Sequence, residues 1–258
     1  MLDLINIVCS FLQIRDQLNI CIINKDTYDC VKIQKLVFDK NYILTESILK
    51  QNKFSDLIIL DLSYNTKIKD INHLIYLEEL NSSRSVLPDS GISELKFIKK
   101  LNVENNKFVK CIEHFTNLTE LNCGGCCMVS EKNINEMKSL KYLKVLKISN
   151  NRKIKNIDSL INLIELDCSW VNNEMANENL KNLTTLKKIN IRNNNKITDL
   201  NMLINLEYLI CNNVIKIEGI NNLKKLKLIN IKDNSNIKEE DLKKMFNGII
   251  IISDYYNF

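Results

Sequence analysis

The amino-acid sequence predicts an α/β solenoid, a right-handed superhelix of stacked coils in which every coil contributes one short parallel strand. Three observations support this prediction. Apolar residues return in a fixed register every 20 to 25 residues, a period typical of solenoids. Between these clusters, apolar residues recur at every third position. The chain has 258 residues, of which 45% are hydrophobic and 26% charged, so it can bury a sizeable core.

The repeating unit is clearest from Leu57 to Asn65, which follow the pattern L-x-x-L-x-L-x-x-N. The same frame, in full or variant form, starts at ten positions: Ile33, Leu57, Leu77, Ile98, Leu118, Leu143, Leu163, Leu186, Leu206 and Leu226. The pattern resembles the leucine-rich repeat superfamily over about residues 31–258. This resemblance implies about ten coils that share one apolar interior.

Each coil is expected to contain a strand and a tighter return. The L-x-L alternation turns every second side chain inward, as in a short strand. Apolar residues then follow three apart, as at Ile68, Ile71 and Leu74, which favours 3₁₀-like turns. The longer coils have room for helical turns around Lys132–Leu140 and Asn177–Leu183.

A finer alternation indicates that the unit of duplication is a pair of coils, about 43 residues long. At the sixth position large and small side chains alternate, in the order Leu62, Ser82, Val103, Cys123, Ile148, Cys168, Ile191, Cys211 and Ile231. Alternating volumes would fill the interior without overpacking. The ninth position alternates between Asn and another residue, beginning with Asn65 and Ser85. We expect each Asn to bond backbone groups at its turn and in the neighbouring coil, because an unsatisfied buried amide costs about 1–3 kcal/mol.

The C-terminal end of the solenoid needs a cap, because a terminal coil exposes its interior. Residues Glu239–Phe246 predict a helix closed by the Asn-Gly pair at 247–248. Ile249–Ile252 are expected to form the last strand, and the aromatic tail at 255–258 is expected to cover it.

Residues 1–31 precede the solenoid, assigned to residues 32–258, and are expected to form a separate helical segment. The stretch Asp3–Leu12 resembles the first helix of an F-box, and residues 16–28 resemble its later part. This resemblance implies binding to the S-phase-kinase-associated adaptor through five apolar anchors, Leu4, Ile7, Val8, Phe11 and Leu12. The alternative is that the helical segment only caps the first coil.

Cysteine and histidine positions predict no catalytic, cofactor-binding or metal-binding residue. Cys123 and Cys126 have C-x-x-C spacing, but they fall at the sixth and ninth repeat positions and no second such pair occurs. His73 and His114 fall at equivalent return positions two coils apart, with no nucleophile in frame. The chain is therefore not expected to be an enzyme.

Composition also limits the expected compartment and partners. The N-terminus carries Asp3 and no basic run, which argues against a signal peptide, and no apolar run approaches the roughly 18–20 residues of a membrane span. Nine Cys without regular disulfide spacing then favour reduced thiols in the cytoplasm. If the Ile-, Asn- and Lys-rich bias belongs to a large DNA virus, this is the host-cell cytoplasm. The net charge of +5 is spread along the chain, which argues against nucleic-acid binding.

The concave face of the solenoid is the predicted site for a protein partner. Exposed aromatic residues near Arg are typical interface anchors. The candidates on this face are Tyr64, Arg84, Trp170, Arg192 and Tyr208. The order of the two segments resembles the F-box/leucine-rich repeat substrate receptors of cullin-RING ubiquitin ligases, which implies a non-catalytic receptor subunit. The alternative is a free-standing recognition module with no link to ubiquitin.

Overall fold

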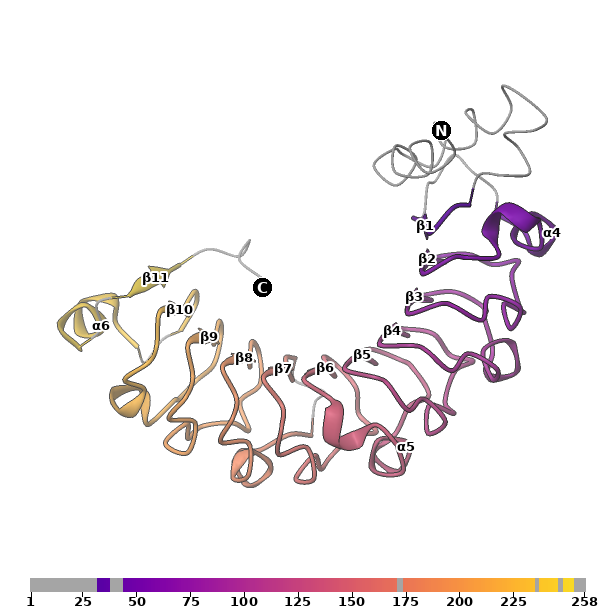
Figure 1. The fold of residues 1–258 in the computed structure, drawn as a ribbon. Helices are drawn as coiled ribbons and strands as arrows, with labels where there is room; N and C mark the ends of the chain where they lie inside the picture. The colour runs from indigo at the N-terminus through magenta and orange to yellow at the C-terminus, as the bar shows by residue number, and fades with distance from the viewer. Residues whose placement is uncertain (1–31, 38–43, 171–173, 235–236, 246–247, 253–258) are drawn as a thin grey trace.

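Short parallel strands dominate the architecture. The computed structural model describes residues 32–37, 44–170, 174–234, 237–245 and 248–252. Within these residues eleven strands form a single sheet, in which β1 to β11 follow one another in chain order. Figure 1 shows the strands along the inner edge of an open arc, with the return segments on its outer edge. This arrangement is the leucine-rich repeat solenoid that the sequence predicts.

The elements are short because the chain turns as soon as each L-x-L motif ends. The strands are β1 (Lys35–Leu36), β2 (Ile59–Asp61), β3 (Glu79–Asn81), β4 (Lys100–Asn102), β5 (Glu120–Asn122), β6 (Val145–Lys147), β7 (Glu165–Asp167), β8 (Lys188–Asn190), β9 (Tyr208–Ile210), β10 (Leu228–Asn230) and β11 (Ile249–Ile251). The helices are α4 (Glu46–Leu49), η1 (Asn52–Phe54), η2 (Asp89–Gly91), α5 (Glu131–Asn135), η3 (Leu140–Tyr142), η4 (Asn177–Leu180), η5 (Ile220–Asn222) and α6 (Glu239–Met245), where η denotes a 3₁₀-helix.

One residue in each strand points into the interior, and the parallel register aligns these residues across the sheet. The aligned set is Leu36, Leu60, Leu80, Leu101, Leu121, Leu146, Leu166, Ile189, Leu209, Ile229 and Ile250. From Leu36 to Ile229 each side chain is at most 2% exposed. Each such Leu or Ile contributes roughly 1.5–3 kcal/mol of burial free energy, but only because neighbouring coils cover it.

The alternation of large and small residues at the sixth position lies inside this core. All nine residues from Leu62 to Ile231 in that row are buried, including the polar Ser82. The apolar residues of the return, such as Ile68, Ile71 and Leu74, are buried as well. Both rows therefore confirm the predicted interior.

The ninth-position Asn residues join the coils in pairs. Asn106 is fully buried, and its Nδ2 donates to the carbonyl oxygens of Ser82 and Leu87 in the preceding coil, each at 3.1 Å. Its Oδ1 accepts the backbone N–H groups of Phe108 and Val109 in its own turn, at 2.8 and 3.3 Å. One amide thus satisfies buried backbone groups of two coils.

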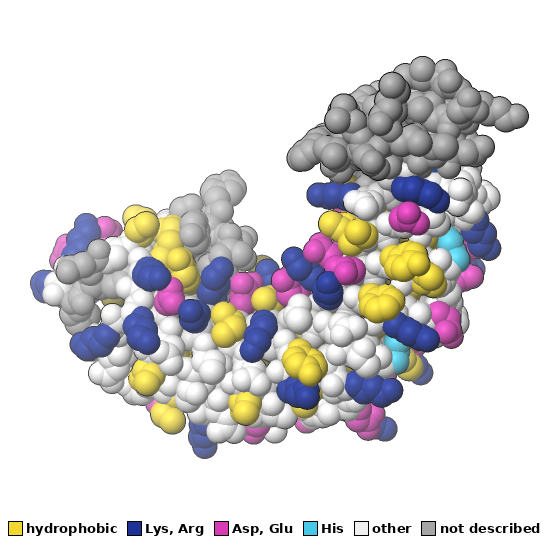
Figure 2. All heavy atoms as spheres, viewed as in Figure 1, with side chains coloured by type: hydrophobic (Ala, Val, Ile, Leu, Met, Phe, Trp, Pro, Cys, Tyr) yellow, Lys and Arg dark blue, Asp and Glu magenta, His cyan; other side chains and the backbone are white. Residues whose placement is uncertain are grey.

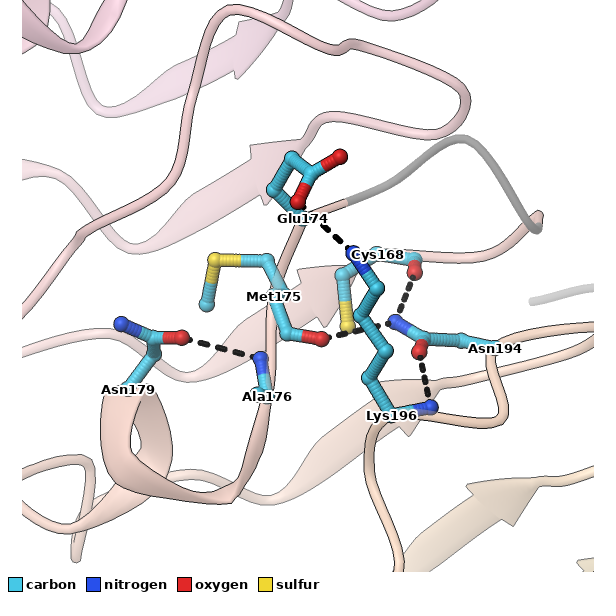
Figure 3. A network of polar contacts seen from close by, with 7 residues as sticks. All are labelled: Cys168, Glu174, Met175, Ala176, Asn179, Asn194 and Lys196. Atoms are coloured by element: carbon cyan, nitrogen blue, oxygen red, sulfur yellow. Dashed lines mark hydrogen bonds and ion pairs between the residues drawn. The ribbon is translucent and has the colours of Figure 1, made fainter.

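The same arrangement recurs in every second coil. Figure 3 shows Asn194, whose Nδ2 donates to the carbonyls of Cys168 and Met175 while its Oδ1 accepts the N–H of Lys196. The other members that reach back to the preceding coil are Asn65, Asn151 and Asn234. These contacts confirm both the expected role of the Asn row and the coil pair as the repeating unit.

A second set of bonds joins the same pairs from the opposite direction. In the first coil of a pair, an acidic or amide side chain at the start of the return accepts backbone N–H groups of the second coil. Asp89 Oδ1 accepts the N–H groups of Lys110 and Cys111, at 2.8 and 2.9 Å. The equivalent side chains in other pairs are Glu46, Glu131 and Asn177. In each of these pairs, a side chain of the second coil therefore bonds backbone of the first, and a side chain of the first bonds backbone of the second.

The helical turns of the long coils are shorter than predicted. The segment expected to be helical over Lys132–Leu140 ends as an α-helix at Asn135, because the N–H of Lys138 bonds instead to the Glu113 carbonyl of the preceding coil. The segment expected at Asn177–Leu183 is the 3₁₀-helix η4.

At the C-terminal end α6 and β11 confirm the predicted helix and strand, whereas the aromatic tail lies outside the described residues.

We predict that Asn106→Ala lowers the free energy of unfolding by at least about 2 kcal/mol, because it leaves buried carbonyl and N–H groups of two coils without partners. The matched control is Asn117→Ala. Asn117 is exposed and donates one bond, to the Lys96 carbonyl at 3.0 Å, so its loss should cost under about 1 kcal/mol. Urea denaturation followed by circular dichroism measures both values. Equal losses for the two variants would show that the buried amide is not needed to join the coils.

Candidate functional site

The concave face of the sheet is formed by the first and third residues of the strands. These residues point outward because successive side chains of a strand lie on opposite faces. A groove of about 330 Å³ crosses β2 to β6 on this face. Its lining includes the first residue of each of these strands, in the order Ile59, Glu79, Lys100, Glu120 and Val145. The groove is therefore apolar at both ends of this row and charged between them.

Ion pairs order the charged side chains of this first-residue row. Lys100 Nζ lies 3.4 Å from a carboxylate oxygen of Glu120 and 3.4 Å from one of Glu79, and these two charges raise the pKa of Lys100. Farther along, Glu165 pairs with Lys147 at 3.1 Å and with Lys188 at 3.8 Å. Figure 2 shows acidic and basic side chains side by side along the inner edge of the arc. Pairs this exposed add little stability, but they fix the positions of the charges.

Asn or Asp is the third residue of seven of the described strands. The Oδ1 atom of each accepts the backbone N–H two residues later, as from Ser63 to Asp61 at 2.8 Å and from Glu104 to Asn102 at 3.0 Å. The same bond forms at Asn81, Asn122, Asp167, Asn190 and Asn230. These side chains close the turn after each strand. These side chains thus serve the fold, whatever binds to the face.

In each repeat from the one that begins at Leu57 onward, the eighth residue has a left-handed backbone conformation, with φ between 52° and 78°. The residues in this row are Tyr64, Arg84, Asn105, Gly125, Asn150, Trp170, Asn193, Asn213 and Asp233. The turn is imposed by the neighbouring coil, whose carbonyl accepts the N–H of this residue, as Ser83 does for Tyr64 at 3.0 Å. Gly, Asn and Asp tolerate this conformation, whereas it costs other residues roughly 1–2 kcal/mol. Tyr64, Arg84 and Trp170 are the members of the row that bear this cost.

The structure arranges the five predicted partner-binding residues as stacked pairs. The Arg84 guanidinium lies 5.4 Å from the ring centre of Tyr64, and that of Arg192 lies 5.6 Å from the ring centre of Trp170. Tyr208 stacks with Lys188 of the adjacent strand at 5.4 Å. Tyr64 and Trp170 are 56% and 46% exposed, and Arg84 is also exposed. Arg192 and Tyr208 are half-buried.

Sequence reasoning placed these residues on the face but missed why they project from it. It treated Tyr64 and Trp170 as ordinary outward strand positions, whereas both lie in the left-handed turn beyond the strand. The available signal was the row itself, in which the equivalent residues of other coils are Asn, Gly or Asp. Lys188 was also missed as a stacking partner, because its ring contact joins two coils and leaves no local pattern.

The predicted adaptor-binding residues, Leu4, Ile7, Val8, Phe11 and Leu12, lie outside the described residues.

Within the described part of the chain, no cluster of His, Cys, Asp and Glu could hold a metal ion, and no helix is long and apolar enough to cross a bilayer. His73 and His114 contact backbone instead. Their Nε2 atoms lie 3.2 and 3.3 Å from the carbonyl oxygens of Leu49 and Ile92 in the preceding coils.

The C-x-x-C segment differs in one respect from the sequence prediction. Cys123 is buried as expected, but Cys126 is exposed and Cys127 takes the interior place. The cause is the turn at Gly125, after which the Cys126 N–H bonds to Asn105 Oδ1 at 3.1 Å and stays at the surface. The Cys127 thiol donates to the Cys123 carbonyl. The buried thiols therefore serve the core, and burial raises the pKa of Cys168 and Cys211.

Comparison with known proteins supports the fold. No protein-family model matches the chain, and no curated protein matches it. Among solved structures, it is similar to an internalin (inlF) from Listeria monocytogenes, with a TM-score of 0.58 and 18% identity over 98% of this chain and 88% of that one. It is also similar to a leucine-rich repeat protein from Leptospira interrogans, with a TM-score of 0.55 and 22% identity over 87% and 73% of the two chains. A chain of the mouse RP105/MD-1 complex matches with a TM-score of 0.56 and 18% identity over 81% of this chain and 40% of that one.

The surroundings of Asp167, the third residue of β7, shift its pKa. Burial raises the pKa of Asp167, although bonds from the Ser169 N–H at 3.0 Å and from Asn190 Nδ2 at 3.2 Å, together with the charge of Lys147, act in the opposite direction. A raised pKa means that the folded chain favours the protonated form. This stability contribution is fully present below the pKa of the unfolded chain, and it is lost as the pH rises through the folded pKa.

We therefore predict that the stability of the natural chain relative to Asp167→Asn falls as the pH rises from about 3 to 7, the range that spans an ordinary Asp pKa of about 3.9 and a raised one. The Asn side chain keeps the acceptor for Ser169 but does not titrate. Asn102→Ala, at the equivalent position of β4, changes no titratable group and should give a difference that is independent of pH. Urea denaturation at a series of pH values measures these differences. A relative stability that rises with pH would contradict the prediction.

Proposed function

We propose that this chain is a non-catalytic scaffold that binds a protein partner on the concave face of its solenoid. The observation that carries the proposal is the set of exposed and half-buried aromatic side chains on this face, each stacked against a cation. Aromatic residues and Arg dominate the binding energy of protein interfaces. Stacking restrains the rings before a partner arrives, so less entropy is lost when it binds.

The surroundings of these residues also favour recognition over catalysis. The charged side chains of the face pair with one another, and the Nε2 atoms of both described His residues lie within hydrogen-bond distance of backbone carbonyls. The hydroxyl groups of Ser149 and Ser169 form a hydrogen bond of 2.9 Å with each other. This bond joins two hydroxyl groups and involves no basic side chain. Among structures of similar fold, the RP105/MD-1 match is a complex of two proteins by its own description.

We predict that Trp170→Ala lowers the affinity for a partner by about tenfold or more, equivalent to about 1.4 kcal/mol. Partners recovered from a eukaryotic lysate would be identified, purified and measured one by one by biolayer interferometry. The matched control is Tyr142→Ala, because Tyr142 is 49% exposed, stacks with Lys141 at 4.9 Å and lies in η3 on the return side. A loss at Tyr142 with none at Trp170 would place binding on the return side and refute the proposal.

A finer proposal is that the scaffold is a substrate receptor of a cullin-RING ubiquitin ligase. It is supported by the resemblance of residues 1–31 to an F-box and by the position of that segment before the repeats. In this arrangement Leu4, Ile7, Val8, Phe11 and Leu12 bind the adaptor, while the concave face holds the protein to be modified. The alternative keeps the scaffold as a free-standing module whose first residues only cap the solenoid.

Co-expression with the S-phase-kinase-associated adaptor separates these two alternatives. The receptor proposal predicts that the adaptor co-purifies with the natural chain and is lost with Ile7→Asp and Phe11→Asp combined. Trp170→Ala should retain the adaptor, because the concave face is a different site. Recovery of equal amounts of adaptor with the natural and doubly substituted chains, or of none with either, would leave only the free-standing module.

A further inference from the structure

Two of the stacked pairs lie along one continuous edge of the concave face. Tyr64 and Arg84 are consecutive members of the left-handed row, and Trp170 belongs to the same row with Arg192 beside it in the next coil. Hydrogen bonds from the N–H of each row residue to the next coil make this edge a regular ladder. We name the edge that carries these four residues the anchor rim.

Three residues of the anchor rim, Tyr64, Arg84 and Trp170, occupy a backbone position that does not suit their side chains. Other coils fill the same backbone position with Asn, Gly or Asp, which suit a positive φ. Tyr, Arg and Trp do not suit it, and their side chains are exposed, so they gain little burial in return. Residues held in an unfavourable backbone conformation are typical of binding sites.

The cations of the anchor rim suit a partner with carboxylates. Stacking uses the flat face of a guanidinium and leaves its N–H donors in the plane, where a carboxylate can accept two of them. The Arg84 side chain is exposed and has no acidic partner within the described residues. The Tyr64 ring, against which Arg84 stacks, supplies an apolar surface for the methylene groups of the same Asp or Glu of the partner.

The spacing of the two pairs indicates the size of the partner. Tyr64 follows β2 and Trp170 follows β7, so five steps of roughly 4.8 Å separate them, about 24 Å along the sheet. An extended peptide rises roughly 3.3 Å per residue and covers this distance in about seven residues. Between the pairs the row holds Asn105, Gly125 and Asn150, none of which carries an aromatic ring or a charge.

We propose that the anchor rim binds an acidic segment of the partner protein, with one carboxylate at the Tyr64–Arg84 pair and a second at the Trp170–Arg192 pair. This inference rests on the proposed function and names the partner chemistry. A nucleic acid fits less well, because Glu104 accepts a bond from Asn105 of the row and Glu79 and Glu120 stand on the strands beside it. A nucleic-acid strand carries a charge about every 3.4 Å, so several of its phosphates would face these carboxylates, whereas an acidic segment needs only two carboxylates, one at each Arg.

The test uses a phage-displayed library of random 12-residue peptides as the probe, selected on the full chain. The expected result is enrichment of peptides with two Asp or Glu residues about seven positions apart. Synthetic copies of these peptides should bind Arg84→Asn and Arg192→Asn each at least tenfold more weakly than the natural chain. Arg84→Lys should also lose affinity, because it keeps the charge but not the two-donor geometry.

Controls keep these outcomes separate from unfolding. Asn is the commonest residue of the row, so Arg84→Asn should not lower the melting temperature. Lys141→Asn removes a cation from the return side and should leave peptide affinity within twofold.

Three outcomes would overturn the inference. The first is enrichment of no acidic peptide, and the second is acidic peptides whose affinity both Asn variants leave unchanged. The third is tighter binding of a 20-nucleotide single strand than of any selected peptide. If the selected peptides are not acidic but still lose affinity with Trp170→Ala, the inference fails and the proposed protein-binding function stands.

Discussion

The structure depends on one constraint: a coil of about 20 residues cannot satisfy its own buried backbone. Its strand ends after three residues, and the turn that follows leaves carbonyl and N–H groups inside the apolar core. A side-chain amide is suited to this task, because it has two donors and an acceptor at the end of a short stem. Asn106 and its equivalents use the amide nitrogen to bond carbonyl groups of the preceding coil and the amide oxygen to hold the turn of their own coil. Apolar packing can then close over the turns of both coils without unsatisfied polar groups.

This division of labour leaves the concave face largely independent of the fold. The interior positions and the ninth-position Asn hold the coils together, while the Asn and Asp residues that end most strands close the turns. The exposed side chains of the first strand residue and of the left-handed residue are not needed for that framework. Their side chains can vary without loss of the fold, at a cost of roughly 1–2 kcal/mol when the left-handed residue is not Gly, Asn or Asp. Tyr64, Arg84 and Trp170 show that the chain accepts this cost at two places along the face.

The sequence alone was sufficient for the strands, the core and the coil pairs, because each follows from a period that many copies repeat. Leu60, Leu146 and Leu209 are buried, as their place in the pattern requires. It was insufficient where contacts between coils override local preference. The N–H of Lys138 bonds to the preceding coil and ends α5 early, and the turn at Gly125 exchanges the places of Cys126 and Cys127. The backbone of Trp170 is another such case, since nothing in its own neighbourhood predicts a positive φ for an aromatic residue.

The reciprocal side-chain bonds within each coil pair have a consequence for how such a chain can lengthen or shorten. The two coils of a pair differ, because the second carries the ninth-position Asn that bonds the first. Removing one coil would place two coils of the same kind side by side. A buried Asn would then lose the carbonyl groups that it bonds, or a turn would lose the Asn that holds it. Removing a whole pair restores every bond. Growth by unequal recombination would therefore proceed in whole pairs, and the distance between Tyr64 and Trp170 would change in increments of about 10 Å. A recognition partner with a fixed shape would hold the number of pairs constant over long evolutionary times, even while the exposed sequence drifted.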